Sequence, residues 1–294
     1  MSTPLTGTFT ALVTPMNRDG SLDLGALDAL VDAQLAGGIT GLVPCGTTGE
    51  TATLSLEERD TVVSRVVKRV NGRVPVIAGT GSNATNVTIE NQKRVKDLGA
   101  SHALVVTPFY NKPTQDGMVR HFTAVADAVD IPSVLYNVPP RTGIDLKPET
   151  VMKLAQHPRI VAVKDATSDL DRVTVTARGV SKSFTQLSGE DATACAFTLM
   201  GGHGVISVIS NVVPKETAEM VAHALRGDAA KAREMHAKLR DICMALFWES
   251  NPIPAKAALS MMGRLTDALR LPLVEMTAPN REKLREVLRA GGWI

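Results

Sequence analysis

The sequence predicts an α/β protein built as a (β/α)8 TIM barrel and followed by a C-terminal helical region. About eight short runs of small and β-branched apolar residues alternate with stretches of helical spacing, as in parallel strands covered by helices. The first run lacks the glycine fingerprint that follows the first strand of doubly wound dinucleotide-binding sheets. After Pro214 the pattern is helical without strands. We therefore expect a barrel with the active site over 1–224 and a helical region over 225–294.

Composition favours a small molecule as the partner of this chain. The 294 residues carry 32 Lys and Arg against 30 Asp and Glu, a net charge of +2, and no long run of either sign. This balance gives no electrostatic reason to expect nucleic acid or a membrane surface. The three cysteines, Cys45, Cys195 and Cys243, are widely spaced and form no CxxC, which argues against disulfides and a zinc site. With no signal segment evident, we expect a cytoplasmic protein without a metal or cofactor.

The first two β–α units have clear boundaries. Thr8–Val13 is expected as a strand, and Asp23 as the N-cap of a helix that ends before two glycines. A second strand, Gly41–Pro44, enters the turn Gly46-Thr47-Thr48-Gly49-Glu50. The sequence Ser55-Leu56-Glu57-Glu58 then matches a capping box at the start of the next helix.

The next three units repeat this pattern, and each strand ends in polar or turn residues. The expected strands are Val74–Ala78, Ala103–Val106 and Ser133–Leu135. The second of them ends in Thr107-Pro108-Phe109-Tyr110 and the third in Tyr136-Asn137-Val138-Pro139-Pro140-Arg141. Proline at the first helical position predicts a helix that begins near Pro148.

The remaining elements complete the barrel and add helices. The expected strands are Ile160–Ala166 (IVAVKDA), Phe184–Leu187 and Val205–Ile209, and a helix over about Asp169–Ala177 is expected between the first two. The helices expected beyond the barrel are Glu216–Leu225, Ala229–Phe247, Pro254–Met262 and Pro279–Leu288. These last helices are interpreted as a cap or an assembly surface.

The sixth strand carries the residue that we consider the nucleophile. Because side chains alternate along a strand, Lys164 is expected on the face of Ile160 and Ala162, with Val161 and Val163 on the other face. If that face points into the barrel, partial loss of water favours the neutral amine, which attacks carbonyl carbons. The simpler interpretation is a solvated lysine at the end of a strand.

Other polar side chains follow the strands at the end where TIM barrels hold their active sites. Both tyrosines of the chain, Tyr110 and Tyr136, lie there, and with Thr47 they could relay protons to an imine-forming lysine. The turn that contains Thr48 can offer backbone N–H groups to a carboxylate. Arg141, stiffened by two prolines, can hold a carboxylate with two hydrogen bonds.

Each of these residues also has a purely structural interpretation. A buried tyrosine can be a packing residue, the glycine-flanked turn a tight connection, and Arg141 part of a surface ion pair. His203 precedes its strand, so we expect it at the opposite end of the barrel from the active site.

Six segments in order along the chain resemble the dihydrodipicolinate synthase family, one of the pyruvate-dependent aldolases together with N-acetylneuraminate lyase. The segments are GTTGE, VTPFYNKP, LYNVPPRTG, VAVKDA, GGHGVISV and NPIPAK. The resemblance implies a TIM-barrel lyase without a cofactor, in which pyruvate forms a Schiff base on Lys164. The enamine would then attack L-aspartate 4-semialdehyde in diaminopimelate and lysine biosynthesis.

The same resemblance implies roles for single residues. Tyr136, Thr47 and Tyr110 would form the proton relay, with Tyr110 supplied across a subunit interface of a homotetramer made of two tight dimers. Thr48 would bind the pyruvate carboxylate and Arg141 the semialdehyde carboxylate. Backbone groups of Gly189 and Ile206 would face the imine. Glu190 stands where many members have aspartate, which leaves its contact open.

One departure from the family pattern concerns feedback by lysine. Members that lysine inhibits have an allosteric pocket at the tight-dimer interface, lined by histidine, glutamate and tyrosine. At the matching positions this chain has Leu56, Arg59, Val87 and Phe109. Val87 cannot balance a cation and Arg59 repels one. We therefore expect lysine inhibition to be weak or absent.

Three alternatives stay open at this point. A related aldolase or lyase of 2-keto-3-deoxy acids or N-acetylneuraminate would share the lysine and the tyrosine, but a polyhydroxylated partner calls for hydroxyl-binding groups instead of Arg141. A pyridoxal phosphate enzyme also uses a lysine, although the later loops lack a glycine-rich phosphate cup. A non-catalytic barrel that senses a keto acid is the third.

Overall fold

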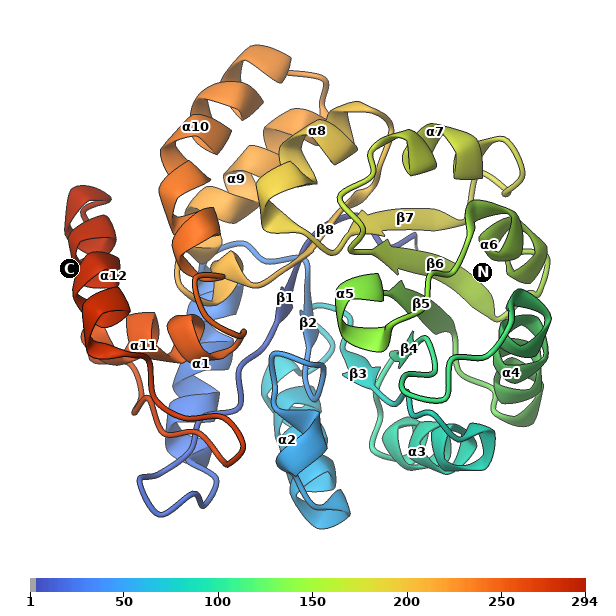
Figure 1. Ribbon diagram of the computed structural model, residues 1–294, viewed down its shortest axis with the longest axis horizontal. Helices are drawn as coiled ribbons and strands as arrows, with labels where there is room; N and C mark the ends of the chain where they lie inside the picture. Colours follow the sequence, from blue (N-terminus) through green and yellow to red (C-terminus); the bar gives the residue numbers. More distant parts are fainter. Residues whose placement is uncertain (1–3) are drawn as a thin grey trace.

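The computed structural model describes residues 4–294 and contains a barrel of parallel strands surrounded by helices (Figure 1). Each strand is three to six residues long, and successive strands alternate with helices, as the apolar runs predicted. The strands are β1 Gly7–Ala11, β2 Gly41–Val43, β3 Ile77–Gly79, β4 His102–Val106, β5 Ser133–Asn137, β6 Ile160–Asp165, β7 Thr185–Ser188 and β8 Gly204–Ser207.

The order of the strands closes the barrel. The eight-stranded sheet runs β2-β1-β8-β7-β6-β5-β4-β3, and every paired neighbour is parallel. An isolated parallel bridge between Leu42 and Val76 joins β2 to the start of β3. The predicted (β/α)8 fold is therefore confirmed, and the carboxyl ends of the strands meet at one mouth.

The helices begin where the sequence offers caps. Asp23 accepts a hydrogen bond from the Ala26 N–H at 2.9 Å, and Ser55 and Glu58 form the predicted capping box. The α-helices are α1 Leu24–Ala36, α2 Leu56–Val70, α3 Thr85–Asp97, α4 Gln115–Ala128, α5 Pro139–Thr142, α6 Pro148–Leu154, α7 Asp171–Ala177, α8 Ala194–Leu199, α9 Pro214–Leu225, α10 Ala229–Ala245, α11 Ile253–Met261 and α12 Ala278–Ala290. The 3-10 turns are η1 Thr51–Thr53, η2 Asp191–Thr193 and η3 Ile209–Asn211.

Two apolar cores lie on the two sides of the strands. The inner core fills the barrel with side chains such as Phe9, Ile77, Leu104, Leu187 and Ile206. The outer core lies between the strands and the helices and continues to the last helix, where Leu284 and Leu288 are fully buried. Strands buried on both faces explain why their sequences are continuous apolar runs.

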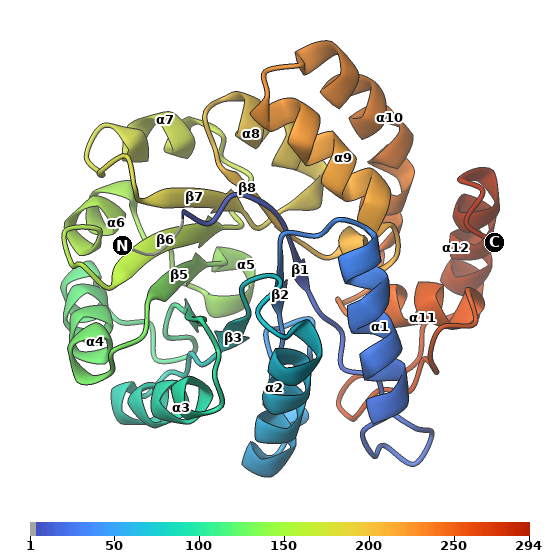
Figure 2. The same cartoon turned by 180° about the vertical axis from the view of Figure 1, so that it is seen from behind.

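The C-terminal helices pack on one side of the barrel. Helix α10 contacts α8 and α9, and α12 lies beside α11 at the edge of the molecule (Figures 1 and 2). The division at 224/225 falls at the end of α9, and it stays a prediction. Within residues 4–294, no helix combines the length and the apolar character needed to cross a membrane.

The strand that carries Lys164 departs from simple alternation. Ser133 pairs with Ile160 but Val134 pairs with Ala162, so β6 has one extra residue, Val161. Ile160 therefore packs in the outer core while Ala162 and Val161 face the inner core. The predictions that Ile160 shares the face of Lys164 and that Val161 lies on the other face are both wrong, because the bulge reverses the alternation at this point.

Two local boundaries also differ from prediction. The segment after Tyr136, expected only as a strand end, contains the short helix α5, whose Pro139 suits the first helical turn. Strand β8 ends at Ser207, and Ile209 belongs to η3 rather than to the strand. Both differences bring polar backbone to the mouth of the barrel.

Candidate active site

The site is centred on Lys164 and Tyr136, which lie side by side on the paired strands β6 and β5. The two residues are direct partners in the β5–β6 register. Lys164 is 5% exposed and Tyr136 7%, and the Lys164 Nζ lies 4.2 Å from the centroid of the Tyr136 ring. The predicted inward orientation of Lys164 is therefore confirmed, and the amine lies against the face of the tyrosine ring.

Gly189 gives the Lys164 side chain its space. A Cβ added at Gly189 would lie 3.0 Å from the Lys164 Cε and 2.7 Å from the Ala166 Cβ. The Gly189 N–H donates to the Asp165 carbonyl oxygen at 2.6 Å, which holds the end of β7 against β6. Only a residue without a side chain lets the backbone approach the amine this closely.

Thr47 lies near Tyr136 at the mouth of the barrel. The two residues line one small cavity at the mouth, together with Gly46, Gly81 and Val106. The structure thus brings together Tyr136 and Thr47, two of the three groups predicted to relay protons. Hydroxyl-bearing side chains that line one cavity are suited to relay protons.

Asn251 links the two residues predicted to hold carboxylates. Its side-chain Nδ2 donates to the Thr48 Oγ1 at 2.9 Å, and its carbonyl oxygen accepts from an Nη2 of Arg141 at 3.2 Å. Thr48 is buried, whereas Arg141 is exposed at the rim. The sequence prediction assigned no role to Asn251, although its segment NPIPAK was among the motifs that carried the resemblance.

A buried ion pair supports the turn that carries Thr47 and Thr48. Lys256 from α11 forms it with Glu50, and both side chains are at most 1% exposed. Lys256 also donates to the Ala268 carbonyl oxygen at 2.8 Å. Burial lowers the pKa of Lys256, and the charge of Glu50 opposes this shift. Lys256 of the C-terminal region therefore helps to hold this turn in place. The sequence analysis did not predict this ion pair.

Beyond the rim lies a larger cavity of about 530 Å³. Its lining includes the polar side chains of Thr47, Arg141 and Asn251 and the apolar side chains of Val87 and Phe109. Its lining thus combines part of the site with residues that the prediction assigned to the feedback pocket. A cavity of this size and lining can hold a small molecule or a side chain.

Tyr110 is the one predicted catalytic residue that points away from the site within this chain. Its side chain is 88% exposed, and its backbone φ of +74° is unusual for a residue with a Cβ. Lys112 in the same loop has φ +46°. The loop geometry therefore projects Tyr110 into solvent.

Two acidic residues follow Gly189 at the end of β7. Burial raises the pKa of Glu190, and the neighbouring charge of Asp191 adds to this shift. The Asp191 carboxylate is buried, and its Oδ2 accepts from the Val208 and Ile209 N–H groups at 2.8 and 3.1 Å. Asp191 thereby fixes the chain just after Ile206, whose side chain fills the inner core.

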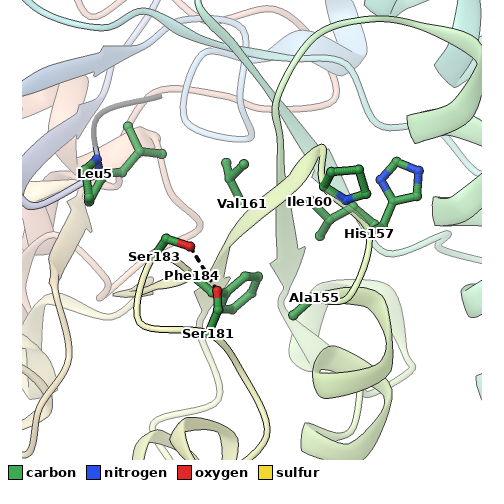
Figure 3. Close-up of a pocket in the computed structure, with 10 residues that line it drawn as sticks. Leu5, Ala155, His157, Ile160, Val161, Ser181, Ser183 and Phe184 are labelled. Carbon is green, nitrogen blue, oxygen red and sulfur yellow. Dashed lines mark hydrogen bonds between the residues drawn. The ribbon is translucent and has the colours of Figure 1, made fainter. Parts of the chain in front are cut away.

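A separate cavity of about 200 Å³ lies at the opposite end of the barrel (Figure 3). Its lining comes from the amino ends of β6 and β7 and includes His157, Val161 and Phe184. His203 also lies at this end, where its Nδ1 accepts from the Gln186 N–H at 3.1 Å. The prediction that His203 lies away from the mouth is confirmed. Within residues 4–294 no three histidine, cysteine or acidic residues group as metal ligands.

These features define a class. A buried lysine over a tyrosine ring at the mouth of a (β/α)8 barrel, beside groups suited to a carboxylate, is the arrangement of a Schiff-base-forming aldolase barrel.

Comparison with known proteins identifies the family. Residues 4–291 match the model of the Dihydrodipicolinate synthetase family. The 4-hydroxy-tetrahydrodipicolinate synthase of Thermodesulfovibrio yellowstonii is 48% identical over 98% of this chain and 99% of its own. The chain belongs to this family and is an enzyme of the lyase class.

Two solved structures match over nearly the whole chain. The chloride-inhibited dihydrodipicolinate synthase of Acinetobacter baumannii, solved with pyruvate, superposes with a TM-score of 0.97 at 44% identity, covering 98% of this chain and 99% of the other. The enzyme of Cyanidioschyzon merolae, solved with lysine bound, gives 0.96 at 39% identity and covers 100% of both chains.

Proposed function

We propose that this enzyme acts as a 4-hydroxy-tetrahydrodipicolinate synthase that joins pyruvate to L-aspartate 4-semialdehyde through a Schiff base on Lys164. The observation that carries the proposal is the position of Lys164, buried at the barrel mouth with its Nζ 4.2 Å from the Tyr136 ring. Family membership over residues 4–291 and the pyruvate held by the Acinetobacter relative support the choice of substrate.

The reaction begins with attack of the neutral Lys164 amine on C2 of pyruvate. The carbinolamine loses its hydroxyl as water, and the iminium then loses a C3 proton to give an enamine. Carbon C3 of the enamine attacks the semialdehyde aldehyde carbon, and the new alkoxide takes up a proton. The semialdehyde amino group then attacks the imine carbon and displaces Lys164, which closes the ring.

Each proton step needs a nearby donor or acceptor. Tyr136 and Thr47, which line one cavity, are assigned to carry protons between the carbinolamine and the solvent side. Thr48, held by Asn251, is assigned to the pyruvate carboxylate together with backbone groups of Gly189 and Ile206. Arg141 at the rim is assigned to the semialdehyde carboxylate, for which a guanidinium is suited.

The position of Tyr110 supports an assembly in which a second copy completes the site. Its ring is exposed, as are the apolar side chains of Leu56, Val87 and Phe109, and the last two line the 530 Å³ cavity. We infer that Tyr110 enters the site of a partner subunit in a tight dimer and that two dimers form a homotetramer, located in the cytoplasm.

Mixed oligomers test the exchange of Tyr110. K164A and Y110F protomers, each inactive or weakly active alone, are unfolded together and refolded. If Tyr110 acts on the partner, a mixed dimer contains one site with Lys164 and a wild-type Tyr110, so activity returns above the sum of the separate variants. Absence of such recovery in verified mixed dimers would show that Tyr110 acts within its own chain.

The choice of second substrate is tested by comparing turnover of the candidate substrates. Turnover with pyruvate and aspartate semialdehyde is compared with cleavage of 2-keto-3-deoxy sugar acids and N-acetylneuraminate at equal enzyme concentration. We expect turnover only with the semialdehyde, because Arg141 offers a cation where a sugar requires hydroxyl-binding groups. Turnover of a sugar acid alone would reject the proposal while keeping the Schiff base.

A further inference from the structure

The residues that follow Tyr136 and Lys164 in sequence are Asn137 and Asp165. Side chains alternate along a strand, so these two point out of the barrel while the tyrosine and the lysine point in. They are direct partners in the β5–β6 register, one position beyond the pair in the site. Asn137 is fully buried and the Asp165 side chain is 11% exposed. What holds them therefore also holds the two reacting side chains.

Arg172 of α7 binds this outer face of the strands. Its Nε donates to the Asp165 Oδ2 at 2.9 Å, its Nη1 to the Asp145 Oδ2 at 3.0 Å, and its Nη2 to the Leu146 carbonyl oxygen. The Arg172 side chain is 11% exposed. A guanidinium with all three nitrogens engaged and little contact with water is held in one orientation.

The network extends from Arg172 to β5. The Asn137 Nδ2 donates to the Asp145 Oδ1 at 2.7 Å, and the Leu146 N–H donates to the Asn137 Oδ1 at 2.9 Å. On β6, the Asp165 Oδ1 accepts from the Thr167 N–H at 2.9 Å. The ends of both strands are thus joined through one arginine.

We propose that Arg172 is a positioning residue for the reaction: by joining Asp165 to Asp145 and Asn137 behind the strands, it sets the relative position of Lys164 and Tyr136. The inference rests on the proposed roles of these two residues. A shift of about 1 Å in a reacting group can lower a rate by about 100-fold. Lysine at position 172 would keep the charge but could not reach three separated acceptors in one plane.

The other end of β6 offers a matched control. Arg159 directly precedes the strand, and its Nε donates to Asp130 Oδ1 at 3.0 Å and its Nη1 to the Ala126 carbonyl oxygen at 2.9 Å. It therefore also makes a carboxylate and a carbonyl contact, but at the end of the barrel away from the site. R159K should lower stability without changing the position of Lys164.

The experiment compares R172K and R159K in the full-length enzyme. Imine formation is followed by quenching with borohydride at short times and weighing the intact protein, and kcat and the pyruvate KM are measured alongside. We expect R172K to slow imine formation and lower kcat about 10-fold or more, with a smaller change in KM, and R159K to change both rates less than about twofold. Equal effects of the two variants, or a folded R172K with wild-type rates, would overturn the proposal.

A double-mutant cycle tests whether Arg172 acts through Asp165. The variant carrying R172K and D165N should be no slower than the slower single variant, because both changes break the same connection. Multiplication of the two effects would contradict this. If R172K does not fold, D145N replaces it, since that side chain is 40% exposed, and a loss of about threefold to tenfold in imine formation is expected.

Failure of this inference is distinct from failure of the proposed function. If the wild-type enzyme forms the adduct on Lys164 and the rates of R172K and D145N are unchanged, only the positioning role of Arg172 is rejected. A wild-type protein without an adduct on Lys164 rejects the function on which the inference rests.

Discussion

The two ends of strand β6 differ in how tightly they are held. At the carboxyl end, Lys164 lies over Tyr136 inside the barrel and Asp165 binds Arg172 outside it. At the amino end, Val161 forms a bulge beside a cavity of about 200 Å³, and the Arg159 side chain is 36% exposed. The same strand is thus fixed from both faces where chemistry is proposed and irregular where it is not.

This difference teaches where a substitution should affect the rate and where it should affect only stability. Groups at the mouth must hold reacting atoms within a fraction of an ångström, so small steric changes there act on catalysis. Groups at the amino end contribute packing and hydrogen bonds, whose loss acts on the free energy of unfolding. The predictions that follow compare the two ends.

The largest effect is expected from G189A at the mouth. The added methyl group would lie 3.0 Å from the Lys164 Cε and 2.7 Å from the Ala166 Cβ, so the lysine or the strand must shift. We expect kcat/KM to fall about 100-fold with the fold retained. The assay is steady-state turnover, with circular dichroism to verify folding.

G179A is the control for this change at the other end. Its methyl group would also meet a side chain, that of Met152, whose Sδ would be 2.1 Å away, but a methionine side chain can move. We expect a lower Tm and turnover within about twofold of wild type. If G179A lost as much activity as G189A, the distinction between the two ends would be lost.

A smaller effect is expected from N251A, which removes the donor that holds the Thr48 hydroxyl at 2.9 Å. Loss of one buried hydrogen bond worth about 1.4 kcal/mol corresponds to about a tenfold change in a binding constant. The pyruvate KM should therefore rise about tenfold. The semialdehyde KM should change less, because Arg141 binds the backbone carbonyl of residue 251, which the substitution retains. Equal rises in both constants would show that Asn251 acts on the whole loop.

The pH dependence of the free energy of unfolding should come from groups away from the mouth. Burial lowers the pKa of His102 and of His121 from 6.5 to about 4 each. The unfolded chain therefore binds more protons than the folded one between these values. The stability that the neutral rings retain above about pH 6.5 is lost as the pH falls toward 4, by about 3 kcal/mol at most for each imidazole.

The measurement is the urea midpoint of wild type and H102Q between about pH 7.5 and about pH 4.5. H102Q stays neutral throughout, so its midpoint should fall less than that of wild type, while turnover at neutral pH is kept. Burial also lowers the pKa of His121, His203 and His236, and these rings account for the fall that remains. The full wild-type dependence in H102Q would contradict the assignment. The hydrogen bond from Arg270 lowers the pKa of the Glu58 carboxyl to about 2. The stability that this carboxylate contributes is therefore lost only at pH values below the range of this measurement.

The smallest effect is expected from free lysine. Arg59, Val87 and Phe109 line the cavity beyond the rim, and Arg59 places a cation where a cationic ligand would bind. We expect less than about twofold inhibition at millimolar lysine in a steady-state assay. Half-inhibition below one millimolar would contradict this, and would show that Thr51, Ala52 and Asn83 suffice to bind the amino acid.

Much of this fold follows from local sequence. Continuous apolar runs and capping residues such as Asp23 and Ser55 predicted the barrel and most helix starts. The bulge at Val161 was not predictable, because an extra residue in an apolar run leaves the run apolar and changes only the pairing with β5. The short helix α5 was missed because two prolines indicate a turn as readily as a first helical turn.

The candidate site was predicted from residues that end strands, and the structure places Lys164, Tyr136, Thr47 and Thr48 at the barrel mouth, while their catalytic and binding roles stay predictions. This principle could not find Asn251 or Lys256, which reach the site from the C-terminal region across some two hundred residues of sequence. Arg172 was missed for a different reason: it lies on a helix behind the strands, and its role depends on three contacts that only the folded chain brings together.

Borohydride trapping tests the central claim most directly. The wild-type enzyme is incubated with pyruvate, reduced, digested and mapped by mass spectrometry. The account predicts one pyruvate-derived adduct for each chain, on Lys164, and none in K164A. An adduct on any other residue, or no adduct on wild type that turns over pyruvate, would contradict it.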